Sequence, residues 1–290
     1  MLGTGNAIGQ TVLYGGRRTA PRPFDGFTAL YTALGYKRLL SSHTGDILVA
    51  RRSSDDDLEG FGFRADGTLD TDALLAWAGA ASAYVSTWYD QSGNGRHALN
   101  ATAAAQPRLV NAGVLDVDAA GNPAAVFDGS NDCLRLQNAL GFSQAADQIT
   151  MAARASVTNG AIGPWLFCDV WSGTDVRSGI SLPTPTSARA GGRRVAGGAA
   201  AYAVGASSTG WHAHIGRIDY AGATADITVD GVTASAAFLA PGATSADTAS
   251  AAPPTIGGAN TVLFMAGQVS TLVLAREALD PAGLTTALLG

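Results

Sequence analysis

The stretch from Trp211 to Gly231, WHAHIGRIDYAGATADITVDG, decides the fold class. Between Trp211 and Tyr220 the side chains alternate with a period of two, which is the spacing of a half-buried β-strand. Ile227 to Val229 is a second strand, and Asp230-Gly231 after it indicates a two-residue type I′ turn, which needs positive φ at both central residues. The stretch therefore predicts a strand followed by a β-hairpin.

Short runs of the same kind, separated by Gly, Pro, Asn or Asp, occupy most of the chain. Regular short strands with turn residues between them are typical of a β-sandwich or a barrel. The further runs are Ile47 to Arg52, Tyr84 to Tyr89, Ala124 to Phe127, Leu134 to Leu136, Ile149 to Val157, Trp165 to Val170 and Gln268 to Leu274.

Other segments predict helix or loop. The spacing of apolar residues between Phe27 and Leu40 approximates a helical face, and Thr71 to Ala78 is a second predicted helix, capped by Asp70 or Thr71 and followed by Gly79. Trp171 to Ser208 is rich in Gly and Arg, which predicts one or two long loops on a rigid scaffold, where binding usually occurs.

Charge and composition exclude several classes of function. The 290 residues carry a net charge of −5, only 14% are charged, and the arginines form no stripe that could follow a phosphate backbone. No apolar stretch is long enough to span a membrane, and the first residues lack the pattern of a signal peptide. We therefore expect neither a nucleic-acid partner nor membrane insertion.

A continuous motif in the first half of the chain carries a family resemblance. Val85 to Ala98, VSTWYDQSGNGRHA, followed by QPRLV at 106–110, resembles the YDQSGNG signature of the catalytic domain of family 54 α-L-arabinofuranosidases, and Arg51 to Asp55 is similar to the region before it. Downstream, residues 123–132, 210–212, 226–231, 256–258 and 267–270 resemble the ordered landmarks of laminin-G-like or concanavalin A-like jelly rolls. The combination also resembles domains of tail and spike proteins of phages and phage-like particles.

The resemblance implies a mainly β protein, a concanavalin A-like jelly-roll β-sandwich with a short α-containing N-terminal region. Residues 1–24, with five Gly and two Pro, form an extended arm that either lacks order or is ordered by a partner. Residues 25–290 form the carbohydrate-binding domain, in which helix and strand segments at 25–84 precede the sandwich at 85–290.

The acidic residues bear on whether the implied activity is present. The family uses a Glu nucleophile and an Asp acid/base downstream of the motif, with a vicinal cysteine pair in the sugar pocket, and retaining hydrolysis needs two carboxyl groups about 5 Å apart. This chain has two glutamates, Glu59 before the motif and Glu277 in a C-terminal stretch that predicts a surface turn, and it has no Cys-Cys. An Asp pair such as Asp169 and Asp175 could replace them, although the spacing does not single it out.

We therefore expect a lectin-like attachment protein without catalytic residues, carried on the surface of a virion or phage-like particle. It would be assembled in the cytoplasm, bind cell-surface polysaccharide, contact other particle proteins through residues 1–24 and form a homo-oligomer, so that weak single sites act together. Two alternatives stay open: an arabinofuranosidase-like glycoside hydrolase, and a purely structural spike or capsid-decoration protein.

Sugar sites combine an aromatic face with charged groups that bind hydroxyls. Arginines in the Gly-rich stretch, including Arg189, would meet an anionic polysaccharide through planar bidentate contacts. The predicted carbohydrate-binding residues are Trp171, Asp169, Asp175, Arg177, Arg193 and Arg194.

Four remaining features favour structural roles over chemistry. The Asp90 to Gly95 and Asp128 to Asp132 segments predict tight turns, with a sugar or cation site for the first and a Ca²⁺ loop for the second as alternatives. His212 and His214 share a strand face but lack a third metal ligand, so packing is favoured over a metal pair. Cys133 and Cys168 are predicted to be buried thiols in preference to a disulfide. We expect no metal and no cofactor.

Overall fold

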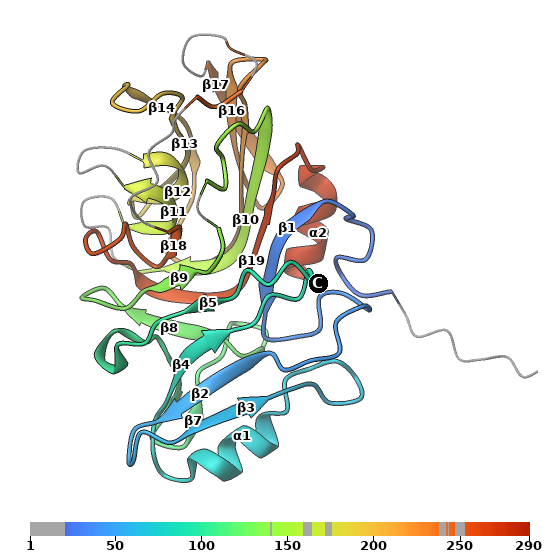
Figure 1. Ribbon diagram of the computed structural model, residues 1–290, viewed down its shortest axis with the longest axis vertical. Helices are drawn as coiled ribbons and strands as arrows, with labels where there is room; N and C mark the ends of the chain where they lie inside the picture. The colour runs from blue at the N-terminus through green and yellow to red at the C-terminus, as the bar shows by residue number, and fades with distance from the viewer. Residues whose placement is uncertain are drawn as a thin grey trace, which may run out of the picture.

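The computed structural model describes residues 21–139, 141–158, 164–171, 176–237, 242, 244–246 and 253–290. In these residues the chain forms β-strands, two α-helices and a short 3-10 helix at Ala103–Ala105 (Figure 1). The elements in chain order are β1 Leu30–Gly35, β2 Leu48–Arg52, β3 Leu58–Phe61, α1 Thr71–Ala78, β4 Ala83–Trp88, β5 Ala98–Leu99, β6 Arg108–Asn111, β7 Val114–Leu115, β8 Ala125–Asp128, β9 Leu134–Leu136, β10 Gln148–Val157, β11 Trp165–Trp171, β12 Val176–Thr184, β13 Ser187–Arg193, β14 Ala200–Ala206, β15 Trp211–Asp219, β16 Thr224–Val229, β17 Val232–Ala237, β18 Thr255–Ile256, β19 Ala266–Ala275 and α2 Pro281–Leu289.

Strand β19 is the hub of the antiparallel sheet. Along one edge its residues 271–275 pair with β1 and its residues 266–269 pair with β8, while β10 pairs along the other edge. From β10 the ladder continues through β15 and β16 to β17, and from β8 it continues through β6 and β4 to β2 and β3. These two runs form one curved layer.

The second layer consists of β11 to β14, joined through β18, β9 and β5 to β4. Strands β13 and β14 contact β15, β16 and β17 across the interior, and the main hydrophobic cluster lies between the layers. The arrangement is a β-sandwich of jelly-roll type, as the sequence predicted.

Helix α2 covers the outer face of the sheet, where β1, β10, β15 and β19 meet (Figure 1). Asp280 caps the helix by accepting the N–H of Gly283 at 2.8 Å, and Leu284 and Leu288 pack on Ile215 and Val273. The sequence did not predict this helix. Because both faces of the sheet are covered here, the strands beneath α2 are buried on both sides.

Burial on two faces explains why the helix predicted over Phe27 to Leu40 is wrong. Strand β1 occupies the middle of that segment, and five of its six residues are buried. A strand covered on both faces carries a nearly continuous apolar run, so its sequence lacks the period of two and can imitate a helical face. The boundary of the predicted arm also shifts: residues 1–20 lie outside the described residues, but Phe24 is fully buried and donates its N–H to the carbonyl of Leu39 at 3.0 Å.

The long loops predicted between Trp171 and Ser208 are also wrong, because β12, β13 and β14 occupy most of this segment. The glycines that suggested loops allow close strand packing instead. Gly192 has φ +158°, and a Cβ built on it would lie 2.1 Å from the carbonyl oxygen of Arg177 on β12. The layer therefore needs glycine at this position, inside a strand.

Several local predictions are confirmed. Helix α1 spans Thr71–Ala78 with Asp70 as its cap, and the hairpin turn has positive φ at Asp230 and Gly231 (47° and 86°). Cys133 and Cys168 are free, buried thiols. No helix in the described part of the chain has the length and apolar character of a membrane span.

Candidate functional site

A row of side chains crosses four neighbouring strands on one face of the sheet. Arg51 on β2 lies opposite Tyr84 on β4, Tyr84 lies opposite Arg108 on β6, and Arg108 lies opposite Val126 on β8. Directly opposite residues in paired strands point to the same face. All four side chains are half-buried, which leaves part of each accessible.

This row forms the floor of a cavity of about 400 Å³. The 3-10 helix at Ala103–Ala105 borders the cavity on one side, and the turn after β8 borders it on another. A cavity of this size is within the range of small-molecule and sugar sites. Its lining residues are Arg51, Ser53, Tyr84, Ala103, Ala104, Gln106, Arg108, Val126, Asp128 and Asp132.

Both guanidinium groups of the row are held in place by protein contacts. Arg51 lies over the ring of Tyr84 at 4.9 Å and donates to Gln106 Oε1 at 2.7 Å and to Asp56 at 2.7 Å. Arg108 makes a two-point ion pair with Asp116, at 2.9 and 3.1 Å. The polar floor is therefore organised before any ligand binds.

The turn Asp128–Asp132 places two carboxyl groups at the edge of the floor. Asp128 is the last residue of β8, two positions beyond Val126, so its side chain starts on the face of the row. Its Oδ1 accepts the N–H groups of Ser130 at 2.8 Å and Asn131 at 3.2 Å, and Asp132 Oδ2 accepts the N–H of Asp128 at 3.0 Å. These exchanged bonds keep the two carboxyl groups close together, one exposed and one buried.

The pKa of the Asp132 carboxyl lies far above that of an ordinary aspartate. Burial of its carboxyl, together with the neighbouring charge of Asp128, raises its pKa to about 7, against the opposing effects of the Asp128 N–H and Arg108. Asp132 therefore keeps its proton between about pH 4 and pH 7, where an ordinary aspartate is ionised. Two adjacent carboxyl groups of which one keeps its proton are the equipment of acid-assisted hydrolysis.

The sequence-predicted site residues lie elsewhere in the fold. Asp169, Arg177 and Arg193 are buried, with 0%, 0% and 1% exposure, and the structure brings Asp169 and Arg177 together, with Arg177 Nη1 3.9 Å from Asp169 Oδ2. Asp169 lies on β11, within the strand that the sequence predicted. Arg177 and Arg193 lie on strands β12 and β13, so their expected placement in long loops is wrong. Ser143 also donates its N–H and hydroxyl to Asp169.

The other members of the predicted set give less information. Arg194 is half-buried directly after β13, the side chain of Trp171 is not described, and Asp175 lies outside the described residues. Arg189 stacks on Tyr202 at 4.2 Å. A sugar-binding role for the predicted set stays a prediction.

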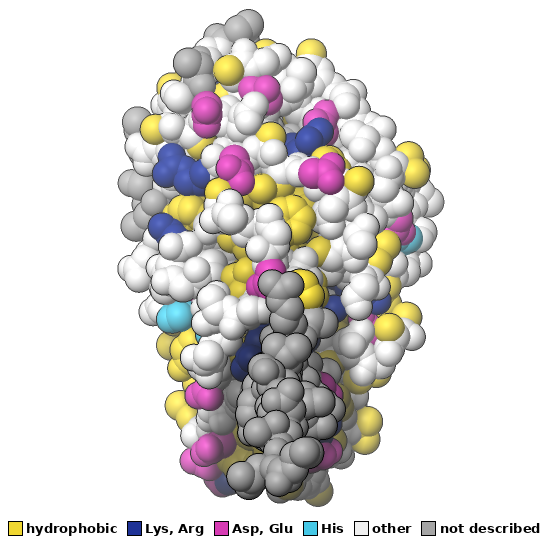
Figure 2. Space-filling view, turned by 90° about the vertical axis from the view of Figure 1, so that its right-hand side faces the viewer, with side chains coloured by type: hydrophobic (Ala, Val, Ile, Leu, Met, Phe, Trp, Pro, Cys, Tyr) yellow, Lys and Arg dark blue, Asp and Glu magenta, His cyan; other side chains and the backbone are white. Residues whose placement is uncertain are grey.

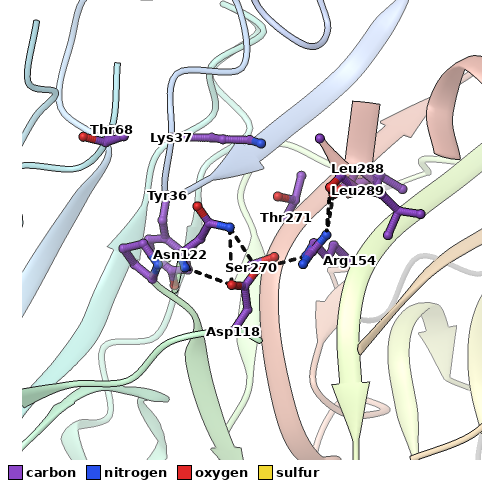
Figure 3. Close-up of a pocket in the computed structure, with 12 residues that line it drawn as sticks. Tyr36, Lys37, Thr68, Asp118, Asn122, Arg154, Ser270, Thr271, Leu288 and Leu289 are labelled. Carbon is purple, nitrogen blue, oxygen red and sulfur yellow. Dashed lines mark hydrogen bonds and ion pairs between the residues drawn. The ribbon is translucent and has the colours of Figure 1, made fainter. Parts of the chain in front are cut away.

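A second, smaller cavity of about 30 Å³ lies beside the end of α2 (Figure 3). Asp118 bonds Asn122 on its own loop and Arg154 on β10, with an Arg154 Nε to Asp118 Oδ2 distance of 3.0 Å, while Lys37 extends along the other side of the cavity. Burial, followed by the charge of Arg154, lowers the pKa of Lys37, with Asp118 opposing. The volume suits one or two water molecules and is too small for a sugar ring.

Surface charge gives no further candidate on the face that Figure 2 displays. Lys and Arg side chains lie scattered among uncharged and hydrophobic ones, without a continuous basic stripe. Among the described residues, no group of three or more His, Cys, Asp or Glu side chains is placed to hold a metal ion.

Solved structures of arabinofuranosidases share this fold. An arabinofuranosidase in complex with arabinofuranosyl-α-1,2-xylobiose matches with a TM-score of 0.64 and 15% identity over 92% of this chain. A mutant GH54 α-L-arabinofuranosidase soaked with 4-nitrophenyl α-L-arabinofuranoside matches with a TM-score of 0.63 and 16% identity, also over 92% of this chain. This chain spans 64% of the length of each structure. No protein-family model matches the sequence, and a search of curated proteins gave no significant match.

These comparisons overturn the first functional expectation. A non-catalytic attachment protein was predicted because Glu59 precedes the YDQSGNG motif, Glu277 lies in a predicted surface turn and the chain has no Cys-Cys. The matching structures are hydrolases with bound arabinofuranosides, so the alternative of a glycoside hydrolase agrees better with them. The likeness itself establishes a shared fold, and activity has to be argued from this chain's own residues.

Sequence reasoning missed the cavity floor. Arg51 and the turn after β8 were noticed separately, but their meeting depends on the register of β2, β4, β6 and β8. A signal was present in the turn, where two Asp residues flank Gly-Ser-Asn directly after a strand. The turn itself was predicted correctly; the altered pKa of its last residue depends on burial, which the sequence did not reveal.

Proposed function

We propose that this protein is a glycoside hydrolase in which Asp132 is the acid catalyst and Asp128 is the second carboxylate. The observation that carries the proposal is the buried Asp132 carboxyl, with its pKa near 7, beside Asp128 at the edge of a 400 Å³ cavity. The fold shared with arabinofuranosidases supports a carbohydrate as the substrate.

The roles follow from the position of each carboxyl group. Asp132 donates its proton to the glycosidic oxygen as the bond to the sugar breaks, which avoids expelling a free alkoxide. Asp128, which is exposed at the rim, faces the positive charge that develops at the anomeric carbon. Because Asp132 must be protonated at the start of the reaction, activity should fall as the pH rises through about 7.

The floor of the cavity supplies the contacts for a sugar. Tyr84 offers an aromatic surface, and Arg51 and Arg108 present guanidinium groups fixed by Asp56 and Asp116. Fixed donors bind hydroxyl groups without losing further side-chain entropy. A polysaccharide or oligosaccharide with an accessible terminal unit is therefore the substrate class we propose.

The test compares two substrates. The leaving group of the first must be protonated, and that of the second leaves without an acid. Release of arabinose from arabinofuranosyl-α-1,2-xylobiose should fall by about 10²- to 10⁴-fold in Asp132→Asn, because a sugar alcohol leaves only when protonated. Hydrolysis of 4-nitrophenyl α-L-arabinofuranoside should fall much less in the same variant, since nitrophenolate leaves without an acid. Asp128→Asn should slow both reactions.

Asp147→Asn is the matched control, since Asp147 is exposed and lies outside the cavity, and its carboxylate accepts the neighbouring N–H of Gln148. It should retain the wild-type rate on both substrates. The proposal fails if the wild-type protein releases no sugar from either arabinofuranoside or from cell-surface polysaccharide. It also fails if the Asp128 and Asp132 variants hydrolyse them at the wild-type rate.

A further inference from the structure

Three side chains form a hydrogen-bonded chain beside the hairpin of β16 and β17. Ser208 Oγ lies 2.6 Å from His212 Nε2, and His212 Nδ1 lies 2.6 Å from Asp230 Oδ2. A hydroxyl on one ring nitrogen and a carboxylate on the other is the geometry of a nucleophile, a base and a positioning group. None of these residues lines the cavity described above.

The ionised carboxylate of Asp230 determines which ring nitrogen of His212 carries the hydrogen. Burial of the carboxyl acts to raise its pKa, but hydrogen bonds from His212 and from the N–H of Ala213 outweigh it, and the pKa of Asp230 is lowered. An ionised carboxylate can only accept, so His212 Nδ1 carries the hydrogen and donates it. His212 Nε2 is then the acceptor for the hydroxyl of Ser208.

The hairpin holds the carboxylate in this position. Asp230 Oδ1 accepts the N–H of Ala213 at 2.8 Å, while the Asp230 N–H donates to the carbonyl of Ala213 at 3.1 Å. Asp230 has a positive φ in the turn, and its carboxylate bonds both His212 and Ala213 on β15. Asp230 therefore belongs to a rigid element and orients the imidazole.

The loop that carries the serine is also anchored. Ser207 donates its N–H to the carbonyl of Thr186 at 3.0 Å, and the hydroxyl of Ser156 donates to the carbonyl of Thr209 at 3.0 Å. Ser208 sits between these two attachments. Its hydroxyl thus faces His212 from a segment that is fixed at both ends.

A second histidine, His214, packs against the ring of His212. The ring of His214 lies 5.8 Å from that of His212 in an edge-to-face arrangement. Burial, followed by the neighbouring His212, lowers the pKa of His214 to about 4. His214 is therefore neutral near pH 7 and places no positive charge beside the base.

Ser208 is open to solvent, as a nucleophile must be. Ser208, Thr209 and Gly210 are exposed, and a Cβ built on Gly210 would lie 3.8 Å from His212 Nε2 and 3.9 Å from Ser208 Oγ. The N–H groups of Thr209 and Gly210 donate to no acceptor within the described residues. They belong to the two residues that follow the serine in the chain.

We propose that Ser208, His212 and Asp230 form a second hydrolytic site, which cleaves small acyl esters such as the acetyl ester of a hydroxyl group. Ser208 Oγ bonds to the ester carbonyl carbon as its proton moves to His212 Nε2. The carbon–oxygen bond to the alcohol then breaks, and His212 returns the proton to the leaving oxygen. Water, deprotonated by His212, attacks the acyl-serine, releases the carboxylic acid and restores Ser208.

The experiment uses the full chain, 4-nitrophenyl acetate as substrate and a fluorophosphonate as a covalent probe of activated serine. We expect steady turnover of the ester and one fluorophosphonate adduct, located on Ser208 by peptide mass spectrometry. Ser208→Ala should lose the adduct and at least about 100-fold of the turnover. Asp230→Asn tests the positioning role: it suits the positive φ of the turn, and it should lower kcat with little change in KM.

Ser207→Ala is the matched control, because Ser207 contacts His214 Nε2 at 3.3 Å and not His212. It should keep both the adduct and the turnover. If Ser208→Ala retains the wild-type rate while His212→Gln loses it, imidazole alone hydrolyses the ester and the proposal is overturned. Absence of any adduct on Ser208 overturns it as well.

This site is independent of the proposed glycoside hydrolysis, and the variants separate the two. Asp132→Asn should leave ester turnover and the Ser208 adduct unchanged, while Ser208→Ala should leave arabinoside hydrolysis unchanged. Failure of one activity therefore leaves the other to be judged on its own variants.

Discussion

Two turns of this chain have nearly the same composition and very different surroundings. DQSGNG at 90–95 follows β4, and DGSND at 128–132 begins at the end of β8. Both start with an Asp whose carboxylate accepts N–H groups of its own turn. They differ in how many hydrogen bonds their polar side chains make with the rest of the protein.

In the first turn, the carboxylate of Asp90 and the amide of Gln91 bond to other parts of the protein. The carboxylate of Asp90 is buried and accepts the N–H groups of Ala33, Ser92 and Arg96 and the hydroxyl of Ser92, at 2.9 to 3.0 Å. The amide of Gln91 bonds the backbone of β1 and of the residues after it, and the Asn94 amide donates to the carbonyl of Leu30 at 2.9 Å. This turn ties β1 to the end of β4, so its role is structural.

In the second turn, the two Asp carboxyl groups accept fewer hydrogen bonds from the described residues. The bonds accepted by Asp128 within the described residues all fall on Oδ1, and Asp132 accepts one N–H. Both residues line the cavity of about 400 Å³, and burial together with the charge of Asp128 raises the pKa of Asp132 to about 7. A motif of Asp, Gly, Ser and Asn therefore indicates a turn, and only the unused acceptors and their surroundings indicate chemistry.

The largest expected effect that separates the two turns is on stability. Asp90→Ala should lower the free energy of unfolding by about 3 kcal/mol, because it leaves buried N–H groups of β1 and of the turn without an acceptor. Urea unfolding followed by tryptophan fluorescence measures the change. Asp128→Ala, which removes bonds to exposed N–H groups, should cost about 1 kcal/mol.

Asp147→Ala controls for loss of a surface charge and should change stability by less than about 0.5 kcal/mol. If Asp90→Ala and Asp128→Ala lowered the free energy of unfolding equally, the two turns would not differ in their structural role.

A smaller effect is expected on the pH dependence of stability. The pKa of Asp132 is raised in the folded protein from 3.8 to about 7, so ionisation is more costly in the fold than in the unfolded chain. The stability that protonated Asp132 contributes is therefore fully present below about pH 4 and is lost as the pH rises through about 7. In wild type this loss should be on the order of 1 kcal/mol, reduced by solvent screening in the open cavity.

Asp132→Asn should remove this part of the pH dependence and be relatively more stable than wild type at pH 8 than at pH 4. Thermal unfolding of both proteins over that range measures the difference. Parallel pH profiles for the two proteins would mean that Asp132 titrates as an ordinary carboxyl.

Local patterns predicted much of the fold. The cap at Asp70, the turn at Asp230-Gly231 and most of the strands after Tyr84 follow from neighbours in the sequence. Segments whose structure depends on distant contacts were missed. Strand β1 is covered by α2 on one face and by the main hydrophobic cluster on the other, and β13 needs Gly192 because β12 lies so close.

The candidate site shows the same limit. The turn at 128–132 was recognisable, but Arg51, Tyr84 and Arg108 are separated by 24 or more residues and meet only through strand register. Arg177 and Arg193 were selected as charges in a Gly-rich stretch and Asp169 as a charge beside Trp171, yet all three are buried. Residue type suggested sugar chemistry, and burial, which could not be deduced from one sequence, decided which carboxyl group keeps its proton.

The smallest expected effect tests whether the two carboxyl groups of the second turn are electrically coupled. Asp128→Asn keeps an oxygen that can accept the N–H groups of Ser130 and Asn131, so stability should stay within about 0.5 kcal/mol of wild type. The charge of Asp128 is lost, so the pKa of Asp132 should fall, while burial should keep it above the ordinary value. Carbon-detected NMR titration of the Asp132 carboxyl measures this directly. An unchanged pKa would show that burial alone holds the proton on Asp132 and that the two carboxyl groups are not electrically coupled.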